Sequence, residues 1–315
     1  MPALHDDEIE IGLPLVRRLV DATLPHLAGR PLRPLGASGS TNALFRLGDD
    51  LLVRLPRQPG GSTVIDKEAR WLPHVAASLP VAVPEFVAVG EPGLGYPERW
   101  SVVHWTDGAT PAVPVAGPHR PADGLARDLA NFVRALGDLP VPPDALTDPA
   151  LRCYRGESLA AMDATAREYL AECRQLPSLD LDLDACLRVW EAAMAMPGSE
   201  EAAPRWLHGD LLAENLLVRD GRLAAVLDFG GLSIGDPTVD LIVAWEVLDH
   251  HGRELFRSIL DVDEATWRRG RAWALLIGLM TFPYYWHSMP ERCAARLAMA
   301  HTVLADAAPL LQEGR

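Results

Sequence analysis

The chain has 315 residues, of which 49% are hydrophobic and 23% are charged, and its formal net charge is −14. This composition is typical of a globular protein, and the length predicts two lobes, because single hydrophobic cores stop growing near ~250–300 residues. The acidic balance argues against nucleic acid and anionic membranes as partners, since binding to phosphate groups needs clustered Lys and Arg.

Patterns typical of exported or membrane-spanning proteins do not stand out in the sequence. The N-terminal segment MPALHDDEIE is acidic, whereas a signal peptide begins with a basic and then an apolar region. The longest late apolar run, residues 272–282, has eleven residues, so we expect a buried helix and not a span of ~20 residues. The cysteines show neither CxxC spacing nor paired histidines, and we expect reduced thiols in a cytoplasmic protein.

Residues 1–105 predict a small β-rich lobe. Apolar and β-branched runs at 42–47, 51–55 and 100–105 are typical of strands, and turn chemistry around Asp50 separates the first two. Between the second and third strands, residues 67–77 carry apolar side chains at helical spacing. We therefore expect the order strand, strand, helix, strand.

Residues 106–315 predict a larger, mostly helical lobe. The stretch 106–122 is rich in Pro and Gly and reads as the connection between the lobes. Residues 124–139 place Leu and Phe at helix-face intervals, with Asp123 as an expected N-cap. The expected fold class is α+β and bilobal, with a β-rich N-lobe and a larger, mostly helical C-lobe.

A hairpin is predicted within residues 208–229, HGDLLAENLLVRDGRLAAVLDF. Residues 216–218 and 223–227 are short apolar strands, and the Asp220-Gly221 pair between them is among the strongest two-residue hairpin signals. Counting outward from this turn places Asn215 opposite Val226 and Ala213 opposite Asp228.

In that register Asn215 and Asp228 lie on a diagonal at the open end of the hairpin, about 7–8 Å apart at the backbone. A carboxylate and an amide oxygen, completed by water and phosphate oxygens, form the oxygen shell that Mg²⁺ favours. Asp210, five residues before Asn215, could orient a substrate hydroxyl and accept its proton during phosphoryl transfer. The alternative is that Asn215 and Asp228 are only turn residues, which leaves His208 and Asp210 unexplained.

Together these residues resemble the catalytic segment of the aminoglycoside phosphotransferase family, the small-molecule branch of the protein-kinase-like fold. The motifs are His208-Gly209-Asp210, Asn215, Asp228-Phe229-Gly230 and Gly235-Asp236-Pro237 followed by Asp240-Leu241. Each is weak alone, but their order over 34 residues is specific.

The resemblance implies a nucleotide-binding lobe over 1–105 and a catalytic and substrate lobe over 106–315. By position, Asp210 is similar to the catalytic base, and Asn215 and Asp228 are similar to the ligands of Mg²⁺. His208 and Asp240 resemble residues that support the same loop.

The first lobe carries the residues that the resemblance assigns to the nucleotide. Segment 36–47, GASGSTNALFRL, resembles the nucleotide-covering loop, and its small residues offer N–H and hydroxyl groups to phosphate. These residues are Ser38, Gly39, Ser40 and Thr41. The strand WSVVHW resembles the hinge, where backbone groups from Val103 to Trp105 would bind the edge of adenine or guanine.

One family feature differs in this chain. The strand lysine that contacts nucleotide phosphates is replaced by Arg54, which keeps the charge and can hold phosphate through two hydrogen bonds. Glu68 resembles the helix acid that pairs with this cation; the alternative is a solvated glutamate favoured by the helix dipole. Lys67, the only lysine, lies at a helix start and is a poor substitute, and Arg57 is an alternative phosphate contact.

The acceptor contacts expected in the second lobe are Glu246 and Asp249, after GDPTVDL, and Tyr285 and Trp286, in TFPYYWHSMP. Acidic groups would suit a polyamine antibiotic, and an aromatic wall would suit a macrolide. The aromatic residues are equally typical of core packing.

The first hypothesis is a Mg²⁺-dependent kinase that moves the γ-phosphoryl group of ATP or GTP to a hydroxyl of a small molecule, an aminoglycoside-type antibiotic. One alternative keeps the chemistry and changes the acceptor to a sugar, choline, homoserine, macrolide or peptide antibiotic. The other is a non-catalytic nucleotide-binding scaffold.

Overall fold

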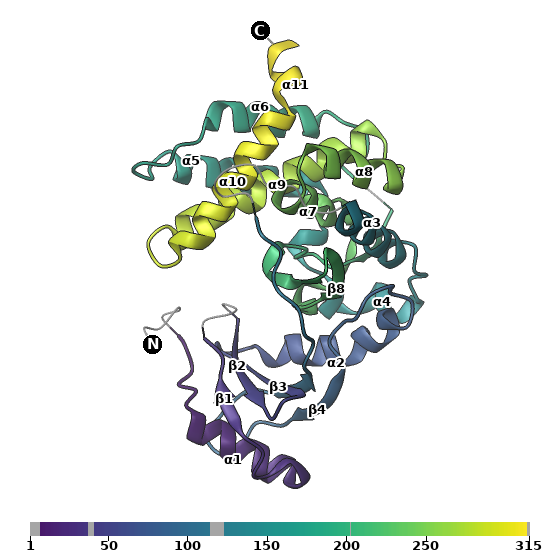
Figure 1. Ribbon diagram of the computed structural model, residues 1–315. Helices are drawn as coiled ribbons and strands as arrows, with labels where there is room; N and C mark the ends of the chain where they lie inside the picture. The colour runs from purple at the N-terminus through teal and green to yellow at the C-terminus, as the bar shows by residue number, and fades with distance from the viewer. Residues whose placement is uncertain (1–6, 37–40, 114–122, 202, 314–315) are drawn as a thin grey trace. The chain divides into compact units, whose positions relative to one another are not determined.

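The computed structural model describes residues 7–36, 41–113, 123–201 and 203–313. The chain divides into two compact units, drawn in Figure 1. Unit 1 comprises Met1–Ala77 and Ala82–Asp107, and unit 2 comprises Ser78–Val81 and Gly108–Arg315. The sequence expectation placed the division after residue 105. The α+β class is confirmed, because unit 1 is built on an antiparallel sheet and unit 2 is mostly helical.

Unit 1 contains a five-stranded antiparallel sheet with strand order β1-β2-β3-β5-β4. The strands are β1 (Leu32–Pro34), β2 (Asn42–Leu47), β3 (Leu51–Pro56), β4 (Phe86–Gly90) and β5 (Trp100–His104). Its helices are α1 (Leu13–Thr23), the short 3₁₀ helix η1 (Pro25–Leu27) and α2 (Ser62–Ala76). The predicted order strand, strand, helix, strand is present as β2, β3, α2 and β5, whereas α1, β1 and β4 were not predicted.

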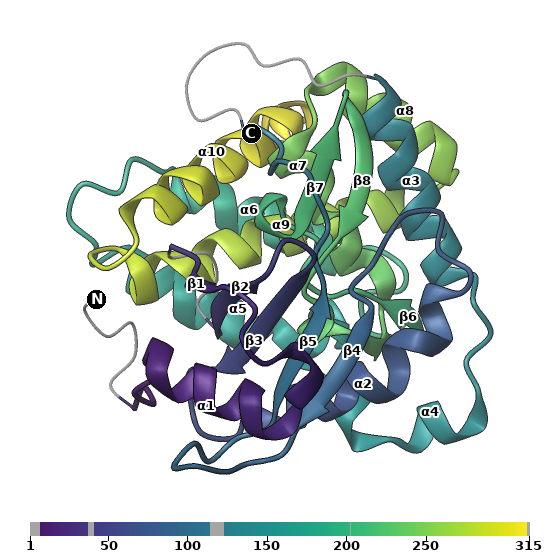
Figure 2. The same cartoon turned by 60° about the horizontal axis from the view of Figure 1, so that its bottom comes forward.

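The two faces of the sheet have different roles, because successive side chains of a strand point to opposite faces. Leu51, Val53 and Leu55 of β3 belong to a buried cluster that includes Val16 and Leu19 of α1. Arg54, between Val53 and Leu55, points to the other face, where it contacts α2. Figure 2 shows α1 lying along the sheet. The sheet therefore buries an apolar core on one face and presents a cation on the other.

In its described residues, unit 2 contains nine α-helices, two two-stranded sheets and five 3₁₀ helices, arranged around a long central helix. The helices are α3 (Asp123–Gly137), α4 (Pro143–Thr147), α5 (Leu159–Cys173), α6 (Leu183–Met194), α7 (Val243–Val247), α8 (His250–Leu260), α9 (Glu264–Tyr285), α10 (Pro290–Asp306) and α11 (Ala308–Glu313). Two antiparallel sheets of two strands each are present. One pairs β6 (Arg205–Leu207) with β9 (Ser233–Gly235), and the other pairs β7 (Leu216–Arg219) with β8 (Arg222–Val226). The 3₁₀ helices are η2 (Pro149–Leu151), η3 (Tyr154–Gly156), η4 (Ala213–Asn215), η5 (Phe229–Gly231) and η6 (Pro237–Ile242).

Helix α9 forms the centre of unit 2. It packs against α5, α6, α10 and η6, and residues 272–277 are buried on every side of the helix. A helix that is apolar all round is expected in a protein core. The prediction of a buried helix over 272–282 is thus confirmed. Within the described residues, no helix combines the length and the apolarity that a membrane span requires.

Strands β7 and β8 confirm the predicted hairpin and its turn. Asp220 and Gly221 have φ values of 53° and 72°, and Arg219 pairs with Arg222. Positive φ at both central residues defines the type I′ turn that Asp-Gly favours.

The register of this hairpin differs from the prediction. Leu217 pairs with Ala225 and Val218 with Leu223, so a β-bulge that leaves Ala224 of β8 unpaired shifts the register by one residue, and Leu216, not Asn215, lies opposite Val226. A bulge inserts one unpaired residue and bends its strand, which simple counting from the turn does not include. The predicted pairing of Asn215 with Val226 is therefore wrong, and Asn215 lies one position closer to Asp228.

The four cysteines are free, and Cys173, Cys186 and Cys293 are buried. Burial raises the pKa of the Cys173 and Cys186 thiols to about 12. These two side chains therefore remain protonated at neutral pH and behave as apolar core groups.

Candidate active site

A single buried carboxylate fixes the loop from His208 to Asp210. Asp240 of η6 is 2% exposed and accepts the N–H of His208 at 2.7 Å and the N–H of Gly209 at 2.8 Å, one on each oxygen. Burial raises the pKa of Asp240 above its ordinary value, despite these two donors. Gly209 has a φ of +78°, and a Cβ there would lie 2.7 Å from the carbonyl oxygen of Gly231. The turn thus requires glycine.

The ring of His208 is fully buried and connects the loop to the end of the hairpin. Its Nε2–H donates to the carbonyl of Leu227 at 3.0 Å, and its Nδ1 accepts the N–H of Asp210 at 3.2 Å. The ring also packs on Phe229, with 4.7 Å between ring centroids. Both nitrogens are used inside the protein, which suits the supporting role expected of His208.

The carboxylate of Asp210 is held on both sides. One oxygen accepts the side-chain N–H of Asn215 at 3.1 Å, and the other forms an ion pair with Arg155. The side chain remains 28% exposed. Burial alone would raise the pKa of Asp210, but the charge and hydrogen bond of Arg155 lower the pKa below its ordinary value. Asp210 is therefore ionised at neutral pH and reachable from solvent.

Asn215 and Asp228 lie at the open end of the hairpin. The carbonyl of Asn215 accepts the N–H of Leu227, the residue before Asp228, at 2.8 Å. Asp228 adopts a left-handed backbone conformation with a φ of 55°, so the chain turns away from the direction of β8 at this residue. The carboxylate of Asp228 accepts the N–H of Gly230 at 3.2 Å. The side-chain nitrogen of Asn215 donates to Asp210, so its amide oxygen is the atom available to a cation.

In unit 1, Arg54 and Glu68 form a buried ion pair. The Nη2 and Nη1 atoms of Arg54 donate to the two oxygens of Glu68 at 2.5 and 3.4 Å, and its Nε donates to the hydroxyl of Ser101 at 3.1 Å. The alternative of a solvated Glu68 is excluded, because its side chain is 2% exposed. Arg57 instead pairs with Glu8 at 2.6 Å, and Lys67 is buried within α2.

Other expected nucleotide contacts are placed only in part. Ser38, Gly39 and Ser40 lie outside the described residues, whereas Thr41 is exposed just before β2. Val103 is buried in β5. The N–H of Trp105 donates to the carbonyl of Asp50 at 2.8 Å, and its side chain stacks under the guanidinium of Arg46 at 3.7 Å.

The two acidic side chains among the expected acceptor contacts both bond within unit 2. Glu246 is 2% exposed, accepts the N–H of Ala213 at 2.6 Å and forms an ion pair with Arg296. Asp249 caps α8 by accepting the N–H of Gly252 at 2.7 Å. A buried charge needs internal partners, and Glu246 has them in Arg296 and the N–H of Ala213; its role as an acceptor contact stays a prediction.

Tyr285 and Trp286, at the end of α9, are both half-buried. Tyr285 lies beneath the guanidinium of Arg292 at 5.1 Å, and Arg292 pairs with Glu214 at 3.3 Å. Glu214 immediately precedes Asn215, so Arg292 connects Tyr285 to the segment before the hairpin through one ion pair. Arg292 and Glu214 were not predicted from the sequence.

Arg155 was also missed. It contacts Asp210 from η3, which lies more than fifty residues earlier in the chain. A single arginine in an irregular segment carries no pattern that would link it to a distant aspartate.

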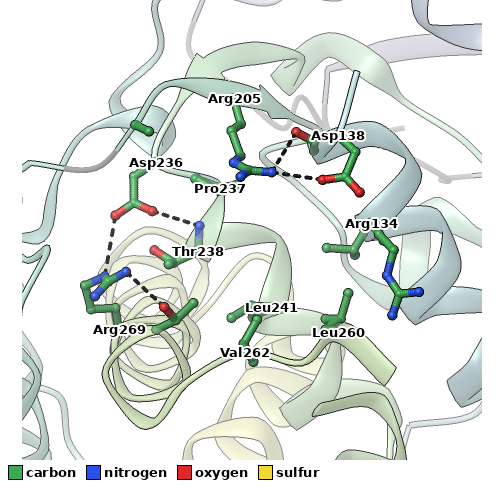
Figure 3. A pocket seen from close by; sticks show the side chains of 14 residues that line it. Arg134, Asp138, Arg205, Asp236, Pro237, Thr238, Leu241, Leu260, Val262 and Arg269 are labelled. Carbon is green, nitrogen blue, oxygen red and sulfur yellow. Dashed lines mark hydrogen bonds and ion pairs between the residues drawn. The ribbon is translucent and has the colours of Figure 1, made fainter. Parts of the chain in front are cut away.

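A cavity of about 430 Å³ in unit 2 is separate from these residues. Figure 3 shows it beside the pair of Asp236 and Arg269, whose charged atoms are 3.9 Å apart. Burial raises the pKa of Asp236. Asp210, Asn215 and Asp228 do not line this cavity.

Comparison with known proteins identifies the family and the fold. The model of the phosphotransferase enzyme family (APH) matches residues 32–273. No curated protein sequence matches the chain. The fold is similar to that of the GDP complex of aminoglycoside 2′-phosphotransferase-IIIa, with a TM-score of 0.70, 19% identity, and coverage of 92% of this chain and 98% of that chain. It is also similar to macrolide 2′-phosphotransferase MphH from Brachybacterium faecium, with a TM-score of 0.59, 23% identity, and coverage of 91% and 97%. The chain thus belongs to the phosphotransferase enzyme family.

Proposed function

We propose that the protein transfers the γ-phosphoryl group of ATP or GTP to a hydroxyl group of a small-molecule antibiotic, in a Mg²⁺-dependent reaction in the cytoplasm. One observation carries the proposal: the amide nitrogen of Asn215 donates to Asp210, which leaves its amide oxygen out of that bond, and the main-chain carbonyl of Asn215 accepts the N–H of Leu227, the residue before Asp228. A base and two oxygen ligands would thereby be assembled at the end of one hairpin.

The donor set at this end fits Mg²⁺. This ion is usually bound through one or two carboxylates, with water and substrate phosphates completing its six positions. In the part of the chain that is described, no group of three or more His, Cys, Asp and Glu could form a closed metal cage. Asp228 and the amide oxygen of Asn215 would hold the ion, which would supply neutralisation of charge on the nucleotide phosphates.

Asp210 would act on the acceptor. Its ionised carboxylate would accept a hydrogen bond from the acceptor hydroxyl and take the proton as the new oxygen–phosphorus bond forms. The bond between the γ-phosphorus and the β–γ bridging oxygen breaks, and ADP or GDP leaves with that electron pair. The two hydrogen-bonding partners of Asp210 would keep its carboxylate in one orientation.

Unit 1 would supply the nucleotide contacts. The pair of Arg54 with Glu68 resembles the cation and acid that position nucleotide phosphates in the kinase-like fold. Because the N–H of Trp105 is already bonded within the unit, a base edge would use carbonyl groups of this segment or the N–H groups that follow it. The relatives solved with GDP and with ADP support a nucleotide donor without choosing between ATP and GTP.

The acceptor has two candidates among antibiotics. Similar structures include an APH(2″)-IIIa complex with kanamycin and a macrolide 2′-phosphotransferase. The pairing of Glu246 with Arg296 and of Glu214 with Arg292 and Arg296 favours the macrolide type, because polycations bind best to uncompensated carboxylates. The half-buried rings of Tyr285 and Trp286 would suit an apolar acceptor.

The test is an acceptor screen read by mass. Wild-type protein with Mg²⁺ and ATP or GTP should add one phosphoryl group to at least one hydroxyl compound in a panel of aminoglycosides, macrolides and metabolites. Asp210→Asn should abolish transfer and leave nucleotide affinity nearly unchanged, whereas Asp220→Asn, in the exposed turn, should retain full activity. Full activity of Asp210→Asn would remove Asp210 from its role, and nucleotide binding without transfer to any compound would favour a scaffold.

A further inference from the structure

Arg155 occupies a central position beside the catalytic loop. One amino group of its guanidinium, Nη1, donates to the carbonyl of Gly209 at 2.8 Å and also bonds to the carboxylate of Asp210. Its Nε donates to the hydroxyl of Tyr154 at 2.8 Å. The side chain is 21% exposed. The other amino group, Nη2, makes no hydrogen bond within the described residues.

The backbone that carries Arg155 is fixed by the Gly235-Asp236 motif. The carbonyl of Gly156 accepts the N–H of Asp236 at 2.8 Å. A Cβ on Gly235 would lie 2.0 Å from that same carbonyl oxygen, a distance that no side chain tolerates. Gly235 therefore allows η3 to approach β9 closely, and this contact sets the position from which Arg155 reaches Asp210.

The positive charge of Arg155 suits the stabilisation of a phosphoryl group during its transfer. Phosphoryl transfer places negative charge on the three equatorial oxygens of the moving group, and catalysis consists largely of positioning and of stabilising that charge. The moving group must meet the hydroxyl that Asp210 orients, so it passes close to the guanidinium on that carboxylate. Arginine suits this role because its planar fork can bind a carboxylate and a phosphate oxygen through different N–H groups.

We propose that Arg155 is a catalytic residue that holds Asp210 through Nη1 and donates from Nη2 to the phosphoryl group as it moves to the acceptor oxygen. This role rests on the proposed kinase function and adds to it a cation within unit 2, on the side of the acceptor. The proposed role of Arg155 gives a use to its Nη2 amino group and a reason for the close contact of Gly156 with Gly235.

The experiment compares a ground-state and a transition-state complex, and it needs no knowledge of the acceptor. Affinities for MgADP and for MgADP with aluminium fluoride, which mimics the moving phosphoryl group, are measured by calorimetry for wild type, Arg155→Ala and Arg155→Lys. Arg152→Ala is the matched control, because Arg152 lies three residues away, is exposed, and its side chain bonds to the carbonyl of Leu146 and to nothing else among the described residues.

We expect MgADP affinity to change less than about twofold in every variant, whereas Arg155→Ala should weaken the aluminium fluoride complex about 10²-fold or more. Arg155→Lys should show an intermediate loss, and Arg152→Ala none. Once an acceptor is known, added guanidinium should restore part of the turnover of Arg155→Ala but not of Asp210→Asn.

Two outcomes would contradict the inference, and they are distinguishable. If wild type binds the aluminium fluoride complex and Arg155→Ala binds it equally tightly, Arg155 does not contact the moving group and the kinase proposal stands. If wild type binds neither complex, the proposed function fails, and the role of Arg155 fails with it. Thermal unfolding of each variant identifies a folding defect. If Arg155→Ala has such a defect, the affinities of Arg155→Lys are compared with those of wild type.

Discussion

The side-chain amide of Asn215 donates to both the main-chain carbonyl and the carboxylate of Asp210, at 2.8 and 3.1 Å. The same amide therefore orients the proposed base with its nitrogen and offers its oxygen to the proposed metal. Asn215 links the two functions because one planar group has a donor and an acceptor at fixed separation.

Replacing Asn215 with Ala should affect both functions at once. We expect kcat to fall about 10²-fold or more, because Asp210 loses its orienting donor, and the Mg²⁺ concentration for half-maximal activity to rise about tenfold, because one ligand is lost. Initial rates over a Mg²⁺ titration measure both quantities. An unchanged Mg²⁺ dependence would show that Asn215 is not a ligand, even if kcat falls.

Because Glu246 and Arg296 form a buried ion pair, we expect substitution of Arg296 to lower the stability of the protein strongly. Arg296→Met leaves the carboxylate of Glu246, which is 1% exposed, without its cation, and should lower the free energy of unfolding by about 3–5 kcal/mol. Urea unfolding measures this loss. The double variant with Glu246→Gln should lose less than the sum of the single variants, because the unpaired charge is gone. Arg167→Met, which breaks an exposed pair with Asp163, is the control, with an expected cost below about 1 kcal/mol.

The sequence predicted the parts of the site that depend on local pattern. Asp220-Gly221 identified the turn because only residues that tolerate positive φ fit there, and the motif spacing placed Asp210, Asn215 and Asp228 on one loop and hairpin. The bulge at Ala224 escaped prediction because alanine carries no signal for a bulge. Register beyond a turn is therefore the least predictable feature of a short hairpin.

Contacts between distant segments could not be predicted. Arg155 reaches Asp210 only because Gly156 and Gly235 allow two backbones to meet, which depends on the packing of the whole unit. Glu246 was expected among the acceptor contacts, yet packing against α10 buries it beside Arg296. In both cases tertiary packing determines whether a charged side chain is free or paired.

Glu98 predicts a pH-dependent contribution to the stability of unit 1. Its carboxylate accepts the N–H groups of Gly60 and Ser62 at 2.9 and 2.8 Å, and the hydroxyl of Ser62 at 2.5 Å, at the start of α2. Burial alone would raise the pKa of Glu98, but these donors lower it below its ordinary value. Because the folded pKa is lowered, the stabilisation is present above the ordinary pKa near ~4.3 and is lost as the pH falls through the folded value.

Glu98→Gln should therefore lower the free energy of unfolding by about 1–3 kcal/mol at pH 7, with a difference from wild type that shrinks toward pH 3. Chemical denaturation at several pH values measures this trend. Glu91→Gln, at an exposed carboxylate, should cost less than about 1 kcal/mol at any pH. A difference for Glu98→Gln that stays constant with pH would show that the charge of Glu98 has no part in the capping of α2.

Arg54 and Arg57 provide the last prediction, because only one of them is expected to contact phosphate. Arg54 is held by Glu68 and Ser101 on the face of the sheet opposite α1, whereas Arg57 pairs with Glu8. Lysine keeps the charge of arginine but cannot reproduce two parallel hydrogen bonds. Arg54→Lys should therefore raise the KM for the nucleotide about tenfold with a smaller change in kcat, and Arg57→Lys should leave both constants nearly unchanged. Steady-state rates with varied nucleotide distinguish the two, and a larger KM effect for Arg57→Lys would assign the phosphate contact to Arg57.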